Sequence, residues 1–246
     1  MPPTAEPRLR LSGILRQWWS EGLARDGWLR TLRRFLAVLW EFLRESTPER
    51  RRRRYGDVEY DWDYRVDTTS ATVGWRDRLL GALLSPYQAT DPALFREMLD
   101  CLNIDFREFT FVDLGSGKGR ALLMAADFPF RRIVGVELLP GLHRVAQQNI
   151  GKYKSDSQKC FAVESVCGDA REFAFPPEPT VLYLFNPLPE PGFAKVVARL
   201  ERSLRECPRP LYVLYHNPLL ESIFSGSTML RKIGGTQQYL IYGSGE

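Results

Sequence analysis

A glycine-rich turn in the middle of the chain has the residue types of a ligand-binding loop. It follows a short apolar run, precedes a helical pattern and reads Asp113-Leu114-Gly115-Ser116-Gly117-Lys118-Gly119. Glycine is needed at such a turn because a side chain would block the close approach of a ligand to the backbone. The turn therefore predicts a nucleotide-type ligand at the end of a strand.

Three kinds of nucleotide site compete for this turn. The Walker phosphate loop requires Gly-x4-Gly-Lys-Ser/Thr, but Val112 stands five residues before Gly117, and Gly119 follows Lys118. The dinucleotide fingerprint requires Gly-x-Gly-x-x-Gly, whereas the spacing here is Gly-x-Gly-x-Gly. The spacing excludes the first site and favours S-adenosyl-L-methionine (SAM) over NAD.

Polar residues that end the following apolar runs suit the same ligand. Glu137 ends the run Val134-Gly135-Val136-Glu137, where such folds place an acceptor for ribose hydroxyls. The segment Cys167-Gly168-Asp169-Ala170 offers a carboxylate where an adenine amino group would lie, and a further run ends in Asn186-Pro187-Leu188-Pro189. Each signal is weak alone, but their order and spacing together are specific.

The elements that must position these residues alternate along the chain. Apolar runs predict strands at 110–114, 132–137, 161–167, 181–185 and 211–215, and helical patterns predict helices at 119–128, 140–153 and 192–206. A hairpin is predicted at 229–233 and 238–242, around Gly234-Gly235. The expected fold is α/β: a doubly wound, mostly parallel seven-strand sheet with a C-terminal antiparallel hairpin, preceded by an N-terminal helical extension.

Residues 106–242 resemble the class I, Rossmann-like SAM-dependent methyltransferases, and residues 55–220 look like a group of unassigned bacterial members with an aromatic-acidic lead-in and a Tyr-x-x-Thr element. The resemblance implies a methyltransferase that converts SAM to S-adenosylhomocysteine. It implies that Asp113 and the glycines hold the methionine half of SAM, Glu137 the ribose hydroxyls and Asp169 the adenine edge. The expected cofactor residues are Asp113, Gly115, Ser116, Gly117, Gly119, Glu137, Leu138, Gly168, Asp169, Ala170, Asn186 and Thr90.

The residues that follow the fourth predicted strand bear on the chemical class of the methyl acceptor. Methyl transfer from a sulfonium is an in-line displacement, so the enzyme must align a neutral nucleophile and exclude water. Asn186 supplies a side-chain carbonyl and Pro187 constrains the neighbouring backbone carbonyl, a pairing that suits an amino nitrogen. The pair resembles the first half of the Asn-Pro-Pro-Tyr box of amino-methyltransferases. Leu188 and Pro189 replace its second half, which counts against stacking on a flipped base.

A second resemblance is to seven-strand lysine methyltransferases, including the histone-lysine enzymes that lack a SET domain. Residues 111–117 reproduce their Phe-Val-Asp-Leu-Gly-Ser-Gly start, and Tyr87 and Thr90 occupy the upstream loop that is expected to fold over the methionine end of SAM. Many methyltransferases share this start, so it does not fix lysine as the acceptor. A protein or other amine acceptor is favoured over nucleic acid and small-molecule oxygen acceptors. A non-catalytic SAM-binding regulatory protein is the alternative function.

His216 is the general-base candidate, because it ends the fifth strand on the edge where doubly wound folds place their active sites. A purely local role at the strand end is equally open. His143 is expected to be exposed on a helix and has no predicted role. The expected catalytic residues are Asn186, Pro187, His216 and Tyr87.

Residues 1–54 are basic: they hold thirteen Arg, no Lys and six Asp or Glu, a net charge of +7 in a chain of net charge +4. Two amphipathic helices separated by Gly27 are predicted from the spacing of Leu11, Ile14, Leu15, Trp18, Trp19 and Leu23 and of Trp28, Leu32, Phe35, Leu36, Leu39 and Leu43. Trp and Leu opposite Arg are typical of interfacial membrane helices, so residues 9–54 are a candidate for peripheral membrane contact. Packing on the chain's own catalytic domain is the alternative.

Three zones are predicted along the chain: a basic helical extension at 1–54, a lead-in at 55–105 that covers the cofactor site, and a SAM-binding domain at 106–246. Residues 55–64 are expected to form a loop, 75–83 a short helix, and Asp91-Pro92 the start of a helix that continues to Leu102. The scattered cysteines predict neither a metal site nor a disulfide framework, and there is no signal-peptide pattern. A cytoplasmic, soluble or membrane-associated protein is expected.

Overall fold

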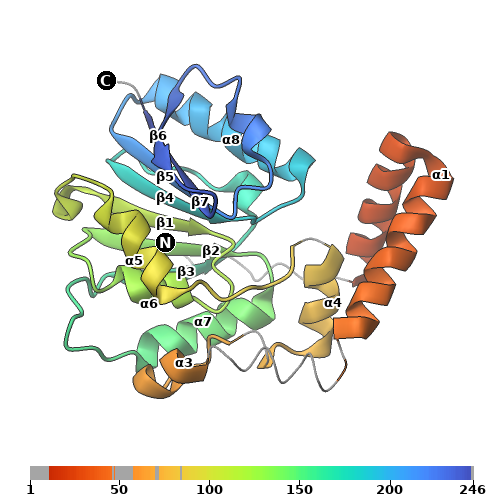
Figure 1. The fold of residues 1–246 in the computed structure, drawn as a ribbon, viewed down its shortest axis with the longest axis horizontal. Helices are drawn as coiled ribbons and strands as arrows, with labels where there is room; N and C mark the ends of the chain where they lie inside the picture. The colour runs from red at the N-terminus through yellow and green to blue at the C-terminus, as the bar shows by residue number, and fades with distance from the viewer. Residues whose placement is uncertain (1–10, 46, 48–57, 70–71, 84, 245–246) are drawn as a thin grey trace. The chain divides into compact units, whose positions relative to one another are not determined.

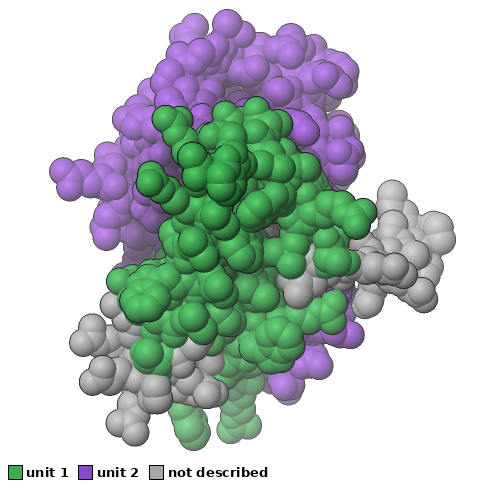
Figure 2. Space-filling model, turned by 90° about the vertical axis from the view of Figure 1, so that its right-hand side faces the viewer, with its two compact units in different colours: residues 1–89 green, residues 90–246 purple. Residues whose placement is uncertain are grey.

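A computed structural model describes residues 11–45, 47, 58–69, 72–83 and 85–244. The chain forms two compact units, residues 1–89 and 90–246, which Figure 2 shows in green and purple. The zone boundaries predicted at 54/55 and 105/106 each fall inside a unit. The second unit starts before residue 106 because helix α5 (Pro92–Asp100) packs on its sheet, with the Phe95 ring 5.9 Å from the ring of Phe111 and 5.3 Å from that of Tyr183.

A seven-strand sheet forms the centre of the second unit, with the strand order β3-β2-β1-β4-β5-β7-β6 (Figure 1). Strand β7 runs antiparallel to both of its neighbours, β5 and β6, while β1 to β5 pair in parallel. This confirms the predicted doubly wound sheet with its C-terminal antiparallel hairpin. The strands are β1 (Thr110–Leu114), β2 (Arg132–Glu137), β3 (Val163–Cys167), β4 (Thr180–Phe185), β5 (Leu211–His216), β6 (Leu230–Gly235) and β7 (Tyr239–Ser244).

Helices cover both faces of this sheet. Helices α6 (Arg120–Ala125) and α7 (Pro140–Lys152) connect β1 to β2 and β2 to β3, and α8 (Glu190–Glu206) connects β4 to β5. Helix α8 buries one apolar stripe against the core, because its apolar residues recur at helical spacing. All five residues of the interior strand β1 are buried, as expected for a parallel strand covered on both sides. The core on the α8 face includes Val112, Leu114, Leu182, Leu184, Phe193, Leu200, Val213 and Tyr215.

Short 3-10 helices and a capped helix shape the connections. Helix α5 begins where the sequence predicts, since the Asp91 carboxylate accepts a hydrogen bond of 2.8 Å from the backbone N–H of Leu94 and Pro92 occupies the first turn. The 3-10 helices are η3 (Phe106–Glu108), η4 (Ala170–Glu172) and η5 (Glu221–Phe224). The segment η4 directly follows β3 and therefore lies at the predicted site.

The regular elements in the described part of the first unit are helices. Helix α1 (Leu11–Glu45) is broken at Gly27, where φ is 73° and ψ is 170°, so it forms two arms that fold back on each other (Figure 1). The break confirms the two helices predicted on either side of Gly27. Helix α4 (Trp75–Leu83) also has its predicted bounds. Among the residues that the structure describes, no helix combines the length and the apolar character needed to cross a membrane.

Two local expectations are wrong. Residues 58–64 of the predicted loop form helix α3 (Val58–Tyr64), in which acidic residues of the first turn interact favourably with the helix dipole. The Tyr60 ring packs against that of Tyr64 at a tilt of 44°, with centroids 4.7 Å apart. Residues 55–57 lie outside the described residues. His143 is buried, not exposed, because it lies on the inward face of α7, where its Nδ1 is 2.8 Å from the Ser165 hydroxyl.

Candidate active site

The glycine-rich turn between β1 and α6 adopts backbone conformations that suit glycine. The φ angles of Gly115, Gly117 and Gly119 are 89°, 54° and 84°, in the left-handed region. The chain also passes close to other segments here: a Cβ on Gly115 would lie 3.0 Å from Pro187 Cβ, and one on Gly119 would lie 3.2 Å from Ala146 Cβ. The turn is thus a close-fitting backbone cradle in which added side chains would displace their neighbours.

Glu137 ties the glycine-rich turn to the end of β2. Its Oε2 accepts a hydrogen bond of 2.8 Å from the Gly117 N–H, and its Oε1 accepts one of 2.8 Å from the Leu139 N–H. The residue is buried, so these charge-assisted bonds offset part of the cost of removing its carboxylate from water. Glu137 therefore has a fixed orientation at the carboxyl edge of the sheet, as its predicted role requires.

Asp113 and Ser116 are buried polar residues, and the Ser116 hydroxyl has no hydrogen-bond partner within the described part of the chain. Burial, and then the nearby charge of Glu137, raise the pKa of Asp113 well above its ordinary value. The hydroxyl of Ser116 packs over β2 at a point where Gly135 leaves room for it. Buried polar groups are usually hydrogen-bonded. A hydroxyl without a partner and a buried carboxylate with a raised pKa, both beside a glycine-rich turn, therefore favour a site for a polar ligand.

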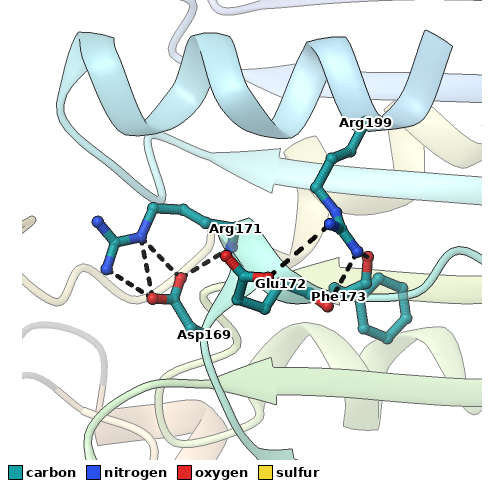
Figure 3. Close-up of polar contacts among 5 residues, drawn as sticks. All are labelled: Asp169, Arg171, Glu172, Phe173 and Arg199. Carbon is teal, nitrogen blue, oxygen red and sulfur yellow. Dashed lines mark hydrogen bonds and ion pairs between the residues drawn. The ribbon is translucent and has the colours of Figure 1, made fainter. Parts of the chain in front are cut away.

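Asp169 stands at the end of β3 and caps η4. The Arg171 guanidinium donates hydrogen bonds to the Asp169 carboxylate, with Nε and Nη2 at 2.9 and 2.6 Å from Oδ2 (Figure 3). The backbone N–H of Arg171 donates to Oδ1 at 2.8 Å. Burial alone would raise the pKa of Asp169, but Arg171 and Lys195 lower it below the ordinary value. Arg199 of α8 donates to the backbone carbonyls of Glu172 and Phe173, so both ends of this loop are held.

Asn186 is locked into the loop after β4. Its φ is 43°, its Nδ2 donates to the Asn217 carbonyl at 2.8 Å, and its Oδ1 accepts from the Tyr215 hydroxyl at 3.1 Å. Asn217 follows β5, also has a positive φ of 49° and is also followed by proline. The two Asn-Pro pairs therefore brace each other, and the predicted acceptor residue Asn186 has a rigid amide plane. The repeat of Asn-Pro at 217–218 was a sequence signal for this pairing.

His216 is the end of a buried chain of hydrogen bonds. Its Nδ1 is 2.8 Å from the Tyr183 hydroxyl, which is 2.9 Å from the Thr90 hydroxyl, and its ring stacks on Phe185 with centroids 3.9 Å apart. Burial lowers the pKa of His216 to about 4, although the charge of Asp91 opposes the shift. The imidazole is consequently neutral near pH 7. Sequence reasoning missed Tyr183, because a tyrosine within a strand has no motif.

The remaining predicted residues divide between the two units. Gly168 lies beside Glu137, since its N–H donates to the Glu137 carbonyl at 2.9 Å; Leu138 is half-buried, and Ala170 is buried as the first residue of η4. Pro187 lies against Gly115. Tyr87 belongs to the first unit, where its hydroxyl donates to the Thr68 carbonyl at 2.5 Å. Its predicted place over the cofactor remains a prediction.

Comparisons with known proteins give structural neighbours only. No protein-family model matches the chain, and no curated protein matches it. An RNA methyltransferase from Salinibacter ruber in complex with S-adenosyl-L-homocysteine is similar at a TM-score of 0.43, with 21% identity over 64% of this chain and 92% of its own.

Two further solved structures are similar to a comparable share of the chain. A TehB-like SAM-dependent methyltransferase from Corynebacterium glutamicum has a TM-score of 0.43 and 14% identity over 61% of this chain and 85% of its own. A predicted N6-adenine-specific DNA methylase from Listeria monocytogenes has a TM-score of 0.47 and 14% identity over 65% of this chain, which spans 52% of that protein. The solved structures that are similar to this chain thus include SAM-dependent methyltransferases.

Proposed function

We propose that residues 90–246 form a SAM-dependent methyltransferase domain that methylates a nitrogen acceptor, with protein lysine as the first candidate. The observation that carries the proposal is a pair of buried groups beside the glycine-rich turn: the Asp113 carboxylate, whose pKa is raised by burial, and the Ser116 hydroxyl, which has no hydrogen-bond partner within the described residues. When bound, SAM would supply an electrophilic methyl group on a sulfonium.

Asp113 has the charge that the methionine half of SAM requires. Burial and the charge of Glu137 make the ionised form of Asp113 unfavourable, and the ammonium group of SAM would offset both effects. Ser116 would add a hydroxyl, and the left-handed backbone at Gly115, Gly117 and Gly119 would give the turn the tight shape that brings its backbone to the ligand. These residues would hold the amino-acid end of the cofactor.

Glu137 is suited to the ribose. Its Oε2 accepts from the Gly117 N–H and its Oε1 from the Leu139 N–H, which hold the carboxylate in one orientation, and a carboxylate is a strong acceptor for a ribose O–H. Asp169 would bind the adenine amino group while sharing its carboxylate with Arg171, with Leu138, Gly168 and Ala170 beside the base. Arg171 then acts as a positioning residue, because it fixes the plane of the Asp169 carboxylate.

The acceptor side is assigned to Asn186, Pro187 and His216. The Asn186 amide is held in one plane by Tyr215 and Asn217, so its oxygen can accept a hydrogen bond from an amine at a fixed position. His216 is neutral at pH 7, which suits a hydrogen-bond acceptor. A base with a pKa of about 4 holds a proton weakly at neutral pH, so His216 serves mainly to orient the amine.

Calorimetric titration of SAM and S-adenosylhomocysteine into the full chain tests the cofactor assignment. We expect binding by the wild type and its loss in Asp113→Ala and Glu137→Ala. Asp127→Ala is the matched control, because Asp127 is a largely buried carboxylate bonded to Tyr153 at 3.1 Å and lies at the other end of α6. Folded wild-type protein that binds neither ligand would overturn the proposal.

The acceptor class is tested with methyl-labelled SAM and fractionated cell extract. Label that is released by protease but resists nuclease supports a protein acceptor, and the reverse pattern refutes it. Asn186→Ala should lower kcat by a larger factor than it weakens the binding of SAM. SAM binding without transfer to any fraction would favour a non-catalytic regulatory protein.

The cytoplasmic location expected from the cysteine pattern is part of the proposal.

A further inference from the structure

The second arm of α1 carries an exposed apolar surface in addition to its packed face. Phe35 packs inward, with its ring 6.1 Å from that of Trp18 and 5.8 Å from that of Trp19. Thr31 is fully buried against Gly22, where an added Cβ would lie 2.8 Å from its methyl group. The large apolar residues that remain exposed on this arm are Trp28, Leu29, Leu36, Leu39, Trp40 and Leu43.

These six residues form one continuous stripe. With 3.6 residues per turn, they fall within an arc of about 120° around the helix, on the side next to the packed face. The stripe spans the whole arm, since Trp28 begins it, 62% exposed, and Leu43 ends it, 55% exposed. We refer to these six residues as the apolar stripe. Such a long surface of Trp and Leu is rare on a monomer unless it binds something.

Arginines border the apolar stripe on one side. Arg33 and Arg44 follow Trp40 around the helix at about 20° and 40° beyond it, and Arg30 lies further round. Arg44 contacts Glu41 at 2.5 Å with both side chains about half exposed, so this ion pair contributes little. The sequence of residues 1–54 adds a net charge of +7, while the remaining residues carry −3. Positive charge is therefore concentrated in the segment that carries the apolar stripe.

We propose that the apolar stripe binds the surface of an anionic phospholipid membrane, with the second arm of α1 lying in the plane of the interface. Leu and Trp would enter the boundary between headgroups and acyl chains, and Arg33 and Arg44 would contact phosphate groups. RNA would engage the arginines but leave six apolar side chains in water. The combination of both features therefore favours lipid. This inference does not rest on the proposed methyltransferase activity.

Vesicle sedimentation of the full chain tests the inference with a matched pair of variants. Trp40 in the apolar stripe and Trp75 at the start of α4 are 68% and 69% exposed, so Trp40→Glu and Trp75→Glu introduce the same charge at equally exposed sites. We expect the wild type to sediment with vesicles that contain phosphatidylglycerol and much less with pure phosphatidylcholine. Trp40→Glu should weaken binding about tenfold or more, and Trp75→Glu should change it little.

Several results would overturn the inference. One is a wild type that does not sediment with anionic vesicles. Another is an equal loss of vesicle binding in both variants. A third is self-association that Trp40→Glu abolishes, in a protein that does not bind vesicles. Binding to RNA that is unaffected by Trp40→Glu, without vesicle binding, would assign the arginines to nucleic acid. Quenching of wild-type tryptophan fluorescence by brominated phospholipid provides a readout that needs no variant. Quenching is expected with anionic vesicles, and its absence there would also refute the inference.

Discussion

Replacing Asp113 by Asn should stabilise the ligand-free protein while abolishing its response to SAM. The Asp113 carboxylate is buried, and the charge of Glu137 lies close enough to disfavour its ionised form further. Its raised pKa means that the charged form is unfavourable in the folded state, so this destabilisation is absent at low pH and develops as the pH rises above the unfolded value. Asn has nearly the same shape and removes the charge.

The size of the effect follows from the extra cost of burying a charge, because the Asn amide is still a buried polar group. That extra cost is on the order of 1–2 kcal/mol, and for a protein of this length each kcal/mol shifts Tm by roughly 2–4 °C. Asp113→Asn should therefore raise the Tm of the ligand-free protein by several degrees. SAM at a hundredfold excess over Kd should stabilise the wild type by about 2.7 kcal/mol, and this shift should vanish in the variant.

Thermal unfolding near neutral pH, with and without SAM, measures both quantities. Asp127→Asn is the control, because this carboxylate accepts a hydrogen bond from Tyr153 and lies 3.9 Å from Arg96. It should lower Tm slightly and leave the response to SAM intact. If Asp113→Asn lowers Tm as the control does, and SAM still raises its Tm by the full wild-type amount, the prediction is wrong.

Three other substitutions or conditions test the local structure. Gly115→Ala places a Cβ at φ 89° and 3.0 Å from Pro187 Cβ, so it should cost about 1–3 kcal/mol and weaken SAM binding; an unfolding free energy equal to that of the wild type would contradict this. His216 has a pKa of about 4 in the folded protein and an ordinary value of 6.5, so its stabilising contribution is complete above pH 6.5 and is lost as the pH falls through 4. Between pH 7.5 and pH 4.5, the unfolding free energy of the wild type should fall by roughly 2–3 kcal/mol more than that of His216→Gln, as measured by urea unfolding. Asp91→Ala removes the N-cap bond to Leu94 and should lower the unfolding free energy by about 1 kcal/mol, measured by urea unfolding, with no loss expected if the cap contributes nothing.

The sheet was predictable from the chain because its strands are apolar runs with clear ends. β1 and β2 have their predicted bounds, and the other strands begin or end within a few residues of them. Helix α3 could not be predicted from periodicity, because its support comes from residues outside the helix. The Asp61 carboxylate accepts hydrogen bonds from the backbone N–H groups of Thr68 and Thr69, which follow it in the chain. A short acidic and aromatic segment has no amphipathic period that would reveal such support.

The chain by itself determined which residues reach the carboxyl edge of the sheet, because residues that end parallel strands must meet there: Asp113, Glu137, Asp169, Asn186 and His216. Only the tertiary structure decided their chemical state. Burial and the proximity of Glu137 set the charge properties of Asp113, Arg171 engages Asp169, and Tyr183 joins Thr90 to His216. The physical reason is that spacing along a chain specifies an edge, whereas desolvation and hydrogen bonding depend on residues brought together from distant segments.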